Sequence, residues 1–177
     1  MKISFKTLML GFAATLIFYS CKKHDHNNQE TLNAQDQTFI RQAALGNSAE
    51  IQLGQFADST ADSSIIQNFA AQLVSDHQAA QNDLKSLGTK LNVSVLDSMD
   101  SSHTMMLDSF RMLSGRAFDS SFIINQINDH NKAISDYQAE IDQGNRTEVI
   151  NYANQYLPKL QQHLNMADSI ASAMHFK

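Results

Sequence analysis

The stretch Gln67–Leu84 reads QNFAAQLVSDHQAAQNDL, and at helical spacing it carries an apolar stripe interrupted by a histidine. The stripe consists of Ile66, Ala70, Leu73, His77, Ala80 and Leu84. Residues three and four positions apart lie on the same face of a helix, so this spacing predicts an amphipathic helix. We expect the imidazole of His77 on the face that packs into the core.

Two later segments repeat this pattern. The stripe between 122 and 141 consists of Ile123, Ile127, His130, Ile134, Tyr137 and Ile141. The stripe between 149 and 174 consists of Ala153, Tyr156, Leu160, His163, Ala167, Ile170 and Met174. Three helices are therefore each expected to direct one histidine toward the core.

Glycine occurs six times and proline once, and no segment alternates apolar and polar residues between turn signals, so the sequence predicts an all-α protein. The expected helices are 36–57, 62–87, 101–113, 118–143 and 147–175. Asp36 is expected to be the N-cap of the first helix, Gly88 to follow the second, and Asp119 to cap the third long helix. Two helical hairpins result, joined by a long crossover that contains a short helix closed by Gly115.

The crossover contains four methionines near His103. They are Met99, Met105, Met106 and Met112. Soft-metal capture is one interpretation. We favour the other, in which methionines fill irregular gaps beneath the crossover.

The level of each histidine along the bundle can be compared from the helical rise. We assume that the first and third long helices are parallel. The inter-helix turns near Thr60 and Asn145 then lie at the same end of the bundle. The three histidine levels then agree within about 5 Å, whereas Glu50 lies roughly 7–12 Å away. Three inward imidazoles at one level indicate a metal site or a proton site.

Residues 1–20 resemble a bacterial lipoprotein signal peptide, with Lys2 and Lys6 before an apolar run and a small residue directly before Cys21. This pattern implies cleavage before Cys21 and its lipidation; a cleaved secretory peptide or a short anchor helix are the alternatives. Residues 21–35 are expected to form a flexible tether and 36–177 the bundle domain. Because Cys21 is the only cysteine, its lipidation leaves no thiol for chemistry elsewhere.

Charge and export together indicate where the domain works. The chain has 13 basic and 18 acidic residues; without Lys2 and Lys6 the mature chain keeps 11 basic residues and a formal charge of −7. This balance argues against a nucleic-acid partner. We expect a domain anchored to a membrane through Cys21, exposed in the periplasm or at the outer membrane of a bacterial envelope, where a protein partner can reach it.

Several ordered motifs resemble the domain-of-unknown-function family 4142. They are AEIQLG at 49–54, FA at 69–70, SDH at 75–77, LSG at 113–115, FD at 118–119, DH at 129–130 and LPKL with HL at 157–164. The similarity covers roughly 36–171. It implies an exported bacterial protein, often a lipoprotein, with a ferritin-like four-helix bundle, and it implies no settled activity.

The candidate ligands of a metal in the bundle are Glu50, His77, His130 and His163, with Asp76 and Asp129 in supporting positions. Ferritin-like di-metal sites use Glu-x-x-His pairs. Here Val74 and Leu160 stand three residues before two of the histidines, which argues against a di-iron oxidase. Such a histidine-rich set suits zinc, copper or a mononuclear iron.

Two classes of function follow from these features. The first, which we favour, is a non-enzymatic envelope lipoprotein whose bundle binds a partner or ligand. Its histidines would form either a buried polar cluster that fixes helix register or a pH-sensitive cluster. The second is a metal-binding or metal-dependent redox bundle. Metal content distinguishes the two.

Overall fold

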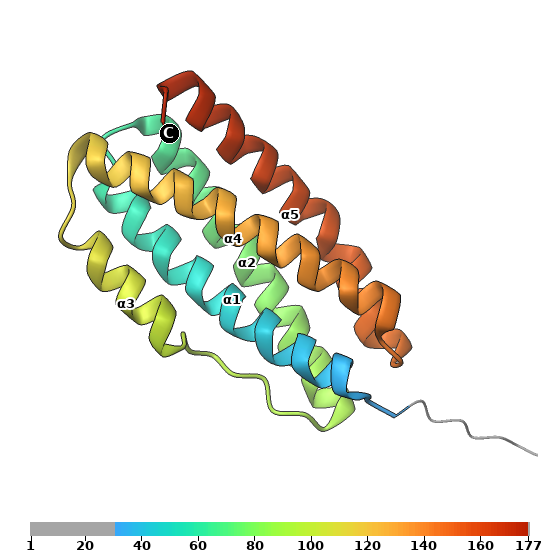
Figure 1. The fold of residues 1–177 in the computed structure, drawn as a ribbon. Coiled ribbons are helices and arrows are strands. Elements are labelled where there is room, and N and C mark those ends of the chain that lie inside the picture. The colour runs from blue at the N-terminus through green and yellow to red at the C-terminus, as the bar shows by residue number, and fades with distance from the viewer. Residues whose placement is uncertain (1–30, 177) are drawn as a thin grey trace, which may run out of the picture.

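The computed structural model describes residues 31–176, and within them the chain forms five helices and no strand. The helices are α1 (Ala34–Thr60), α2 (Ser64–Leu91), α3 (Ser101–Phe110), α4 (Gly115–Gln143) and α5 (Thr147–Met174). The four long helices form a bundle in which α1 pairs with α2 and α4 pairs with α5 (Figure 1). The predicted all-α bundle of two hairpins, joined by a crossover with a short helix, is confirmed. The predicted leader, Cys21 and most of the predicted tether lie outside the described residues.

The direction of α4 differs from the prediction. The backbone N–H of Asn145, in the α4–α5 turn, donates to Asp36 at the start of α1, and the N–H of Asp62, in the α1–α2 turn, donates to Asp119 near the start of α4. The two turns therefore lie at opposite ends of the bundle, and α1 and α4 are antiparallel. The crossover runs back along the bundle before α4 begins (Figure 1). The prediction of parallel helices did not allow for this return and is wrong.

The histidines nevertheless share a level, because each lies near the midpoint of a long helix, and a midpoint stays in place when the direction of the helix is reversed. His77 lies near the middle of α2, His130 near the middle of α4 and His163 near the middle of α5. Glu50 also lies close to the middle of its helix, α1, so it is nearer this level than expected.

The start of α1 is tied to the α4–α5 turn by one carboxylate. Asn33, rather than the predicted Asp36, is the N-cap, and its side chain accepts from the Asp36 N–H at 2.8 Å. The Asp36 carboxylate accepts from the N–H of Asn33 at 2.6 Å and from the N–H groups of Asn145 and Arg146 at 3.0 and 3.1 Å. The Asp36 carboxylate thus accepts hydrogen bonds from the α4–α5 turn as well as from the start of its own helix.

Asp119 likewise serves another helix than the one predicted. Its carboxylate accepts from the backbone N–H groups of Asp62 and Ser63 at 3.1 and 3.2 Å, directly before α2. Its own helix, α4, starts earlier, at Gly115, whose positive φ of 58° suits glycine. Gly115 was expected to close the preceding short helix. That helix instead ends at Phe110, and its N-cap is Asp100.

The second helix is longer than predicted. It continues through Gly88 to Leu91, and Asn92 takes the left-handed conformation at its end. A Cβ on Gly88 would lie 2.8 Å from the carbonyl oxygen of Val93 and 2.5 Å from a methyl of Val95. Glycine is needed there for the close approach of the crossover rather than for a positive φ.

Two apolar clusters fill the bundle, one toward each end. One contains Leu53, Phe69, Leu73, Phe118, Phe122 and Ile123. The other contains Phe39, Ile40, Leu84, Tyr137, Tyr152 and Leu160. Between them along the helices lies a layer of buried polar residues: Asn47, Glu50, His77, Gln81, Gln126, His130 and His163. The polar layer is the part of the core that packing alone does not explain.

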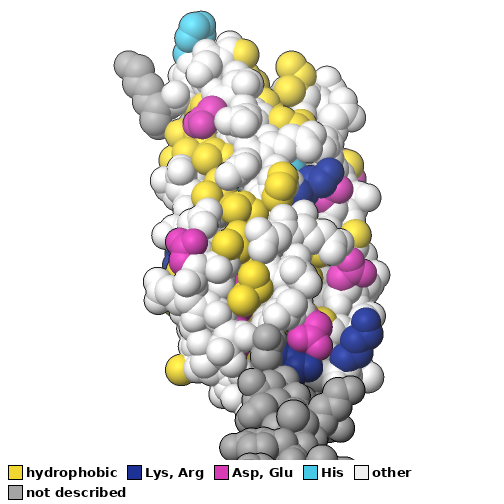
Figure 2. Space-filling view, turned by 90° about the vertical axis from the view of Figure 1, so that its right-hand side faces the viewer, with side chains coloured by type: hydrophobic (Ala, Val, Ile, Leu, Met, Phe, Trp, Pro, Cys, Tyr) yellow, Lys and Arg dark blue, Asp and Glu magenta, His cyan; other side chains and the backbone are white. Residues whose placement is uncertain are grey.

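The face of the molecule shown in Figure 2 carries no concentration of like charges. On the face in Figure 2, basic and acidic side chains stand interspersed among uncharged atoms, and apolar side chains gather along its middle. None of the helices within residues 31–176 combines the length and apolar character that crossing a bilayer requires.

Candidate metal centre

Three histidines from three helices meet in the polar layer. His77 on α2, His130 on α4 and His163 on α5 are 6%, 1% and 0% exposed, and one ring nitrogen of each lies within 4.8 Å of the others. Their ring centroids are 5.3 to 5.8 Å apart. The inward direction predicted for all three is confirmed, whereas their role as ligands stays a prediction.

The tautomer of His77 is set by Asn47 on α1. The Tyr152 hydroxyl donates to the carbonyl of Ala80 at 3.2 Å, so it accepts from the Asn47 side-chain amide at 3.1 Å. This arrangement turns the Asn47 oxygen toward His77 Nδ1, 3.0 Å away, and Nδ1 must donate. Nε2 of His77 then carries a lone pair, and this buried atom has no hydrogen-bond partner among residues 31–176.

His130 and His163 are fixed in the same way. Nδ1 of His130 lies 3.0 Å from the carbonyl oxygen of Gln126, which can only accept, so Nδ1 donates and Nε2 carries the lone pair. Nε2 of His163 lies 2.9 Å from the carboxylate of Asp76, which places its lone pair on Nδ1. Each ring thus donates one N–H, called here the outer N–H, to an oxygen of the protein, and its other nitrogen carries the lone pair.

Three lone pairs consequently point into one space. In metal sites, histidine ligands characteristically donate their second nitrogen to a carboxylate or a carbonyl, which orients the ring and raises its basicity. Here Asn47, Gln126 and Asp76 supply these acceptors. The donor set and its outer partners therefore fit a metal ion bound by three neutral imidazoles.

Burial keeps the rings neutral. It lowers the pKa of His77 well below its usual value, with the neighbouring His130 and His163 adding to the effect. It lowers the pKa of His130 to about 4, again with a contribution from His163. The pKa of His163 is lowered by burial too, although Asp76 acts in the opposite direction. Neutral imidazole is the form that binds a metal.

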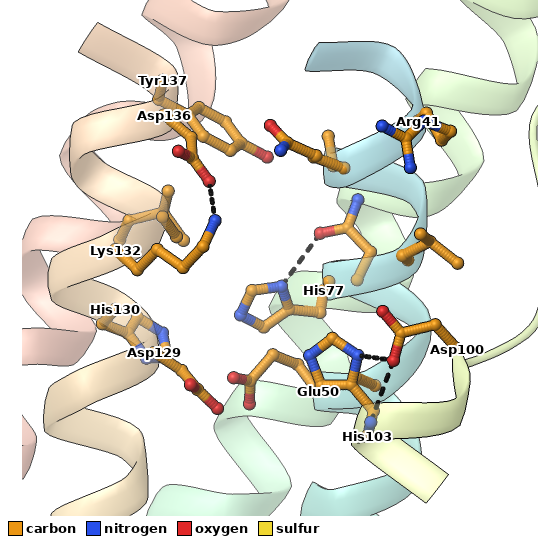
Figure 3. Close-up of a pocket in the computed structure, with 18 of the residues that line it drawn as sticks. Arg41, Glu50, His77, Asp100, His103, Asp129, His130, Lys132, Asp136 and Tyr137 are labelled. Atoms are coloured by element: carbon orange, nitrogen blue, oxygen red, sulfur yellow. Dashed lines mark hydrogen bonds and ion pairs between the residues drawn. The ribbon is translucent and has the colours of Figure 1, made fainter. Parts of the chain in front are cut away.

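Glu50 lies beside the centre rather than among the three nitrogens. Its carboxylate accepts from the side-chain amide of Gln126 at 3.0 Å, and it borders the same cavity as His77 and His130 (Figure 3). Burial, followed by the charge of Asp129, raises the pKa of Glu50 to about 8. Its predicted role as a ligand stays a prediction.

The two aspartates predicted to support the centre have different surroundings. Asp76 accepts from His163, although its neighbour His77 also points inward, because Asp76 reaches across the α2–α5 interface. Asp129 accepts from Asn125 at 2.8 Å and faces Glu50 in the cavity (Figure 3). Asp76 therefore orients a histidine, and Asp129 belongs to the cavity.

Two partners of the histidines were missed from sequence. Asn47 lies three residues before Glu50, so it shares a helix face with a residue that was singled out, although the spacing alone does not distinguish it from other buried amides. The partner of His130 is the main-chain carbonyl of residue 126, four positions earlier in the same helix, which any residue type would supply. The side chain of Gln126 donates to Glu50 instead.

The crossover methionines divide into two pairs. Met99 and Met106 are partly buried against the core, as the packing interpretation requires. Met105 and Met112 are 66% and 85% exposed, so that interpretation is wrong for them. His103 is bound to Asp100 at 2.8 Å and lines the cavity beside Glu50.

Comparisons with known proteins agree with the fold. A family model described as a domain of unknown function, DUF4142, matches residues 21–170. The chain is similar to the crystal structure of a DUF305 fragment from Deinococcus radiodurans, a ferritin-like helical bundle, with a TM-score of 0.70 over 81% of this chain and 99% of that one. At 11% identity this similarity shows the ferritin-like fold alone. No curated protein matches the chain.

Proposed function

The chain belongs to the DUF4142 family, and we propose that its bundle binds one first-row transition-metal ion through His77, His130 and His163. The observation that carries this proposal is the set of three converging lone pairs, each opposed by an outer N–H bonded to Asn47, Gln126 or Asp76. A cluster that only fixed helix register would be expected to pair its nitrogens with donors. Instead, Nε2 of His77 is buried without a partner among residues 31–176.

The donor set favours zinc, copper or iron over calcium or magnesium, because those ions prefer imidazole nitrogen and the latter prefer oxygen. A tetrahedral ion with about 2.0–2.1 Å bonds holds its ligand nitrogens about 3.3 Å apart. Nε2 of His130 and Nδ1 of His163 are 3.3 Å apart, whereas the ring nitrogens of the three histidines are separated by up to 4.8 Å, so His77 would move closer to complete the site. Three histidines leave a fourth coordination position for water or another ligand, the arrangement of metal sites that act on small molecules.

Metal content is the direct test. The full chain is purified without chelators, incubated with zinc, copper or iron in turn, passed through gel filtration and measured by mass spectrometry. We expect about one equivalent to remain bound in the wild type and to be lost in His130→Leu, while His175→Asn, which changes an exposed histidine, retains it. No metal in any preparation would leave the cluster as a polar core.

We also propose that the domain stands at a membrane of the bacterial envelope, held by a lipid on Cys21. The basic start, the apolar run and the small residue before Cys21 support this placement. Incorporation of labelled palmitate, and its loss in Cys21→Ser, is the test. A chain released into the soluble fraction without label would contradict the anchor.

A further inference from the structure

A cavity of about 420 Å³ lies next to the metal centre, bordered mainly by α1, α3 and α4. Its inner end is formed by His77 and His130, and its rim carries the exposed side chains of Arg41 and Lys132 (Figure 3). The unpartnered Nε2 of His77 belongs to a residue that lines this space. The cavity therefore joins the solvent to two of the three proposed ligands.

The other side of the centre is closed. Between α2 and α5, beside Asp76, Lys159 and His163, the free volume is about 10 Å³. A volume of this size is about the minimum that holds one water molecule. A fourth ligand larger than water must therefore approach through the cavity next to α1, α3 and α4.

The cavity walls combine apolar and acidic groups. Phe39, Leu45, Met106 and Leu160 supply apolar surface. The carboxyl groups of Glu50 and Asp129 face one another near the inner end (Figure 3). Small-molecule sites typically have this composition, with apolar walls and a few polar groups that orient the ligand.

Building on the proposed metal site, we infer that this cavity binds a small neutral nitrogen heterocycle, with one ring nitrogen on the metal, an N–H toward the carboxyl groups of Glu50 and Asp129, and an apolar body along the walls. An azole provides a metal-binding nitrogen and an N–H donor in one ring. A carboxylate ligand has no N–H to donate to either carboxyl group and would bring a negative charge beside that of Asp129.

The probe is 4-phenylimidazole, compared with imidazole and benzoate, on the full chain loaded with cobalt(II), whose visible absorption reports a new ligand. We expect 4-phenylimidazole to bind about tenfold or more tightly than imidazole, because its phenyl ring is removed from water. Benzoate should bind more weakly than either azole. Equal affinity for the two azoles, or tighter binding of benzoate, would overturn the inference.

Gly46 provides a variant that leaves the centre unchanged. It lines the cavity, and a Cβ added there meets no atom within 4 Å. Gly46→Leu should fill part of the cavity and abolish the preference for 4-phenylimidazole, whereas Gly46→Ala should keep it. Cobalt retained by gel filtration is measured on the same samples. Loss of cobalt in the wild type counts against the proposed metal site, and retained cobalt without an azole preference counts against the cavity ligand alone.

Discussion

Nε2 of His130 lies 3.3 Å from Nδ1 of His163, and with both rings neutral these two atoms direct lone pairs at one another. Each ring already donates its other nitrogen, to Gln126 and to Asp76, so neither can turn a hydrogen toward its neighbour. Only a cation between or upon them, either a proton or a metal ion, removes the repulsion. Because burial disfavours a protonated ring, a metal ion is the better occupant at neutral pH.

Metal should stabilise the wild-type fold. At a free zinc concentration of 100 times the dissociation constant, binding adds about 2.7 kcal/mol to the free energy of unfolding. Thermal unfolding followed by circular dichroism, with and without zinc, measures this shift. In His130→Leu we expect no shift, and metal-free stability at least equal to that of the wild type, since the facing lone pairs are gone. A zinc shift of equal size in His130→Leu contradicts the assignment.

Asp76 should strengthen metal binding without touching the metal. Because it holds the Nε2 hydrogen of His163, Asp76→Ala is expected to weaken metal affinity by about 10–100-fold. Competition with a chromogenic chelator gives the affinity. Asp83→Ala is the matched control, since Asp83 lies two turns later on the same helix and binds Tyr156 instead. Equal losses in both variants would show a general effect on α2.

The stability of the metal-free protein should fall with acid because of His130. Its pKa is lowered to about 4, so below the ordinary value of 6.5 the unfolded chain takes up a proton that the folded chain refuses. Stability from this group is complete above pH 6.5 and is lost as pH falls toward 4, by up to about 3 kcal/mol. Denaturant unfolding of wild type and His130→Leu across this range should show a steeper loss in the wild type. Parallel curves of stability against pH for the two proteins would contradict the assignment of this loss to His130.

Glu140 should have the opposite effect on the pH dependence of stability, because it destabilises the fold as pH rises. It is fully buried beside Asp36, and burial together with that neighbour raises its pKa to about 8. The unfolded chain releases this proton near the ordinary glutamate pKa of 4.5, so stability falls as pH rises from there toward 8. Glu140→Gln should flatten this fall in melting curves taken between pH 5 and pH 8.5. An unchanged slope would mean that Glu140 is ionised in the fold.

Replacing each of two glycines with alanine should change the stability of the fold in opposite directions. Gly46→Ala adds a methyl in open space within α1 and should stabilise by up to about 1 kcal/mol through helix propensity. Gly144→Ala should destabilise by about 1–3 kcal/mol, because its Cβ would lie 2.6 Å from the carbonyl oxygen of Glu140 and also meet the Glu140 carboxyl group. Chemical denaturation of the two variants in parallel provides the comparison, and a stable Gly144→Ala would show that Glu140 can move aside.

Local features of the chain were predicted where a single helix decides them. The stripes around His77, His130 and His163 follow from the helical period, and all three side chains are buried as that period requires. Features that join two elements were predicted less well. Asp36 and Asp119 were each assigned to their own helix, yet each carboxylate accepts N–H groups from a turn elsewhere in the chain.

By itself the sequence determined that three helices each turn one imidazole inward, because which residues share a helix face depends only on their spacing. Only the tertiary structure decided that α4 runs against α1, because a crossover can return the chain to either end of a bundle. It also decided which nitrogen of His77 and which nitrogen of His163 is left to bind a metal. That choice depends on acceptors such as Asn47 on α1 and Asp76 on α2, and hydrogen bonds between helices exist only once the helices are packed.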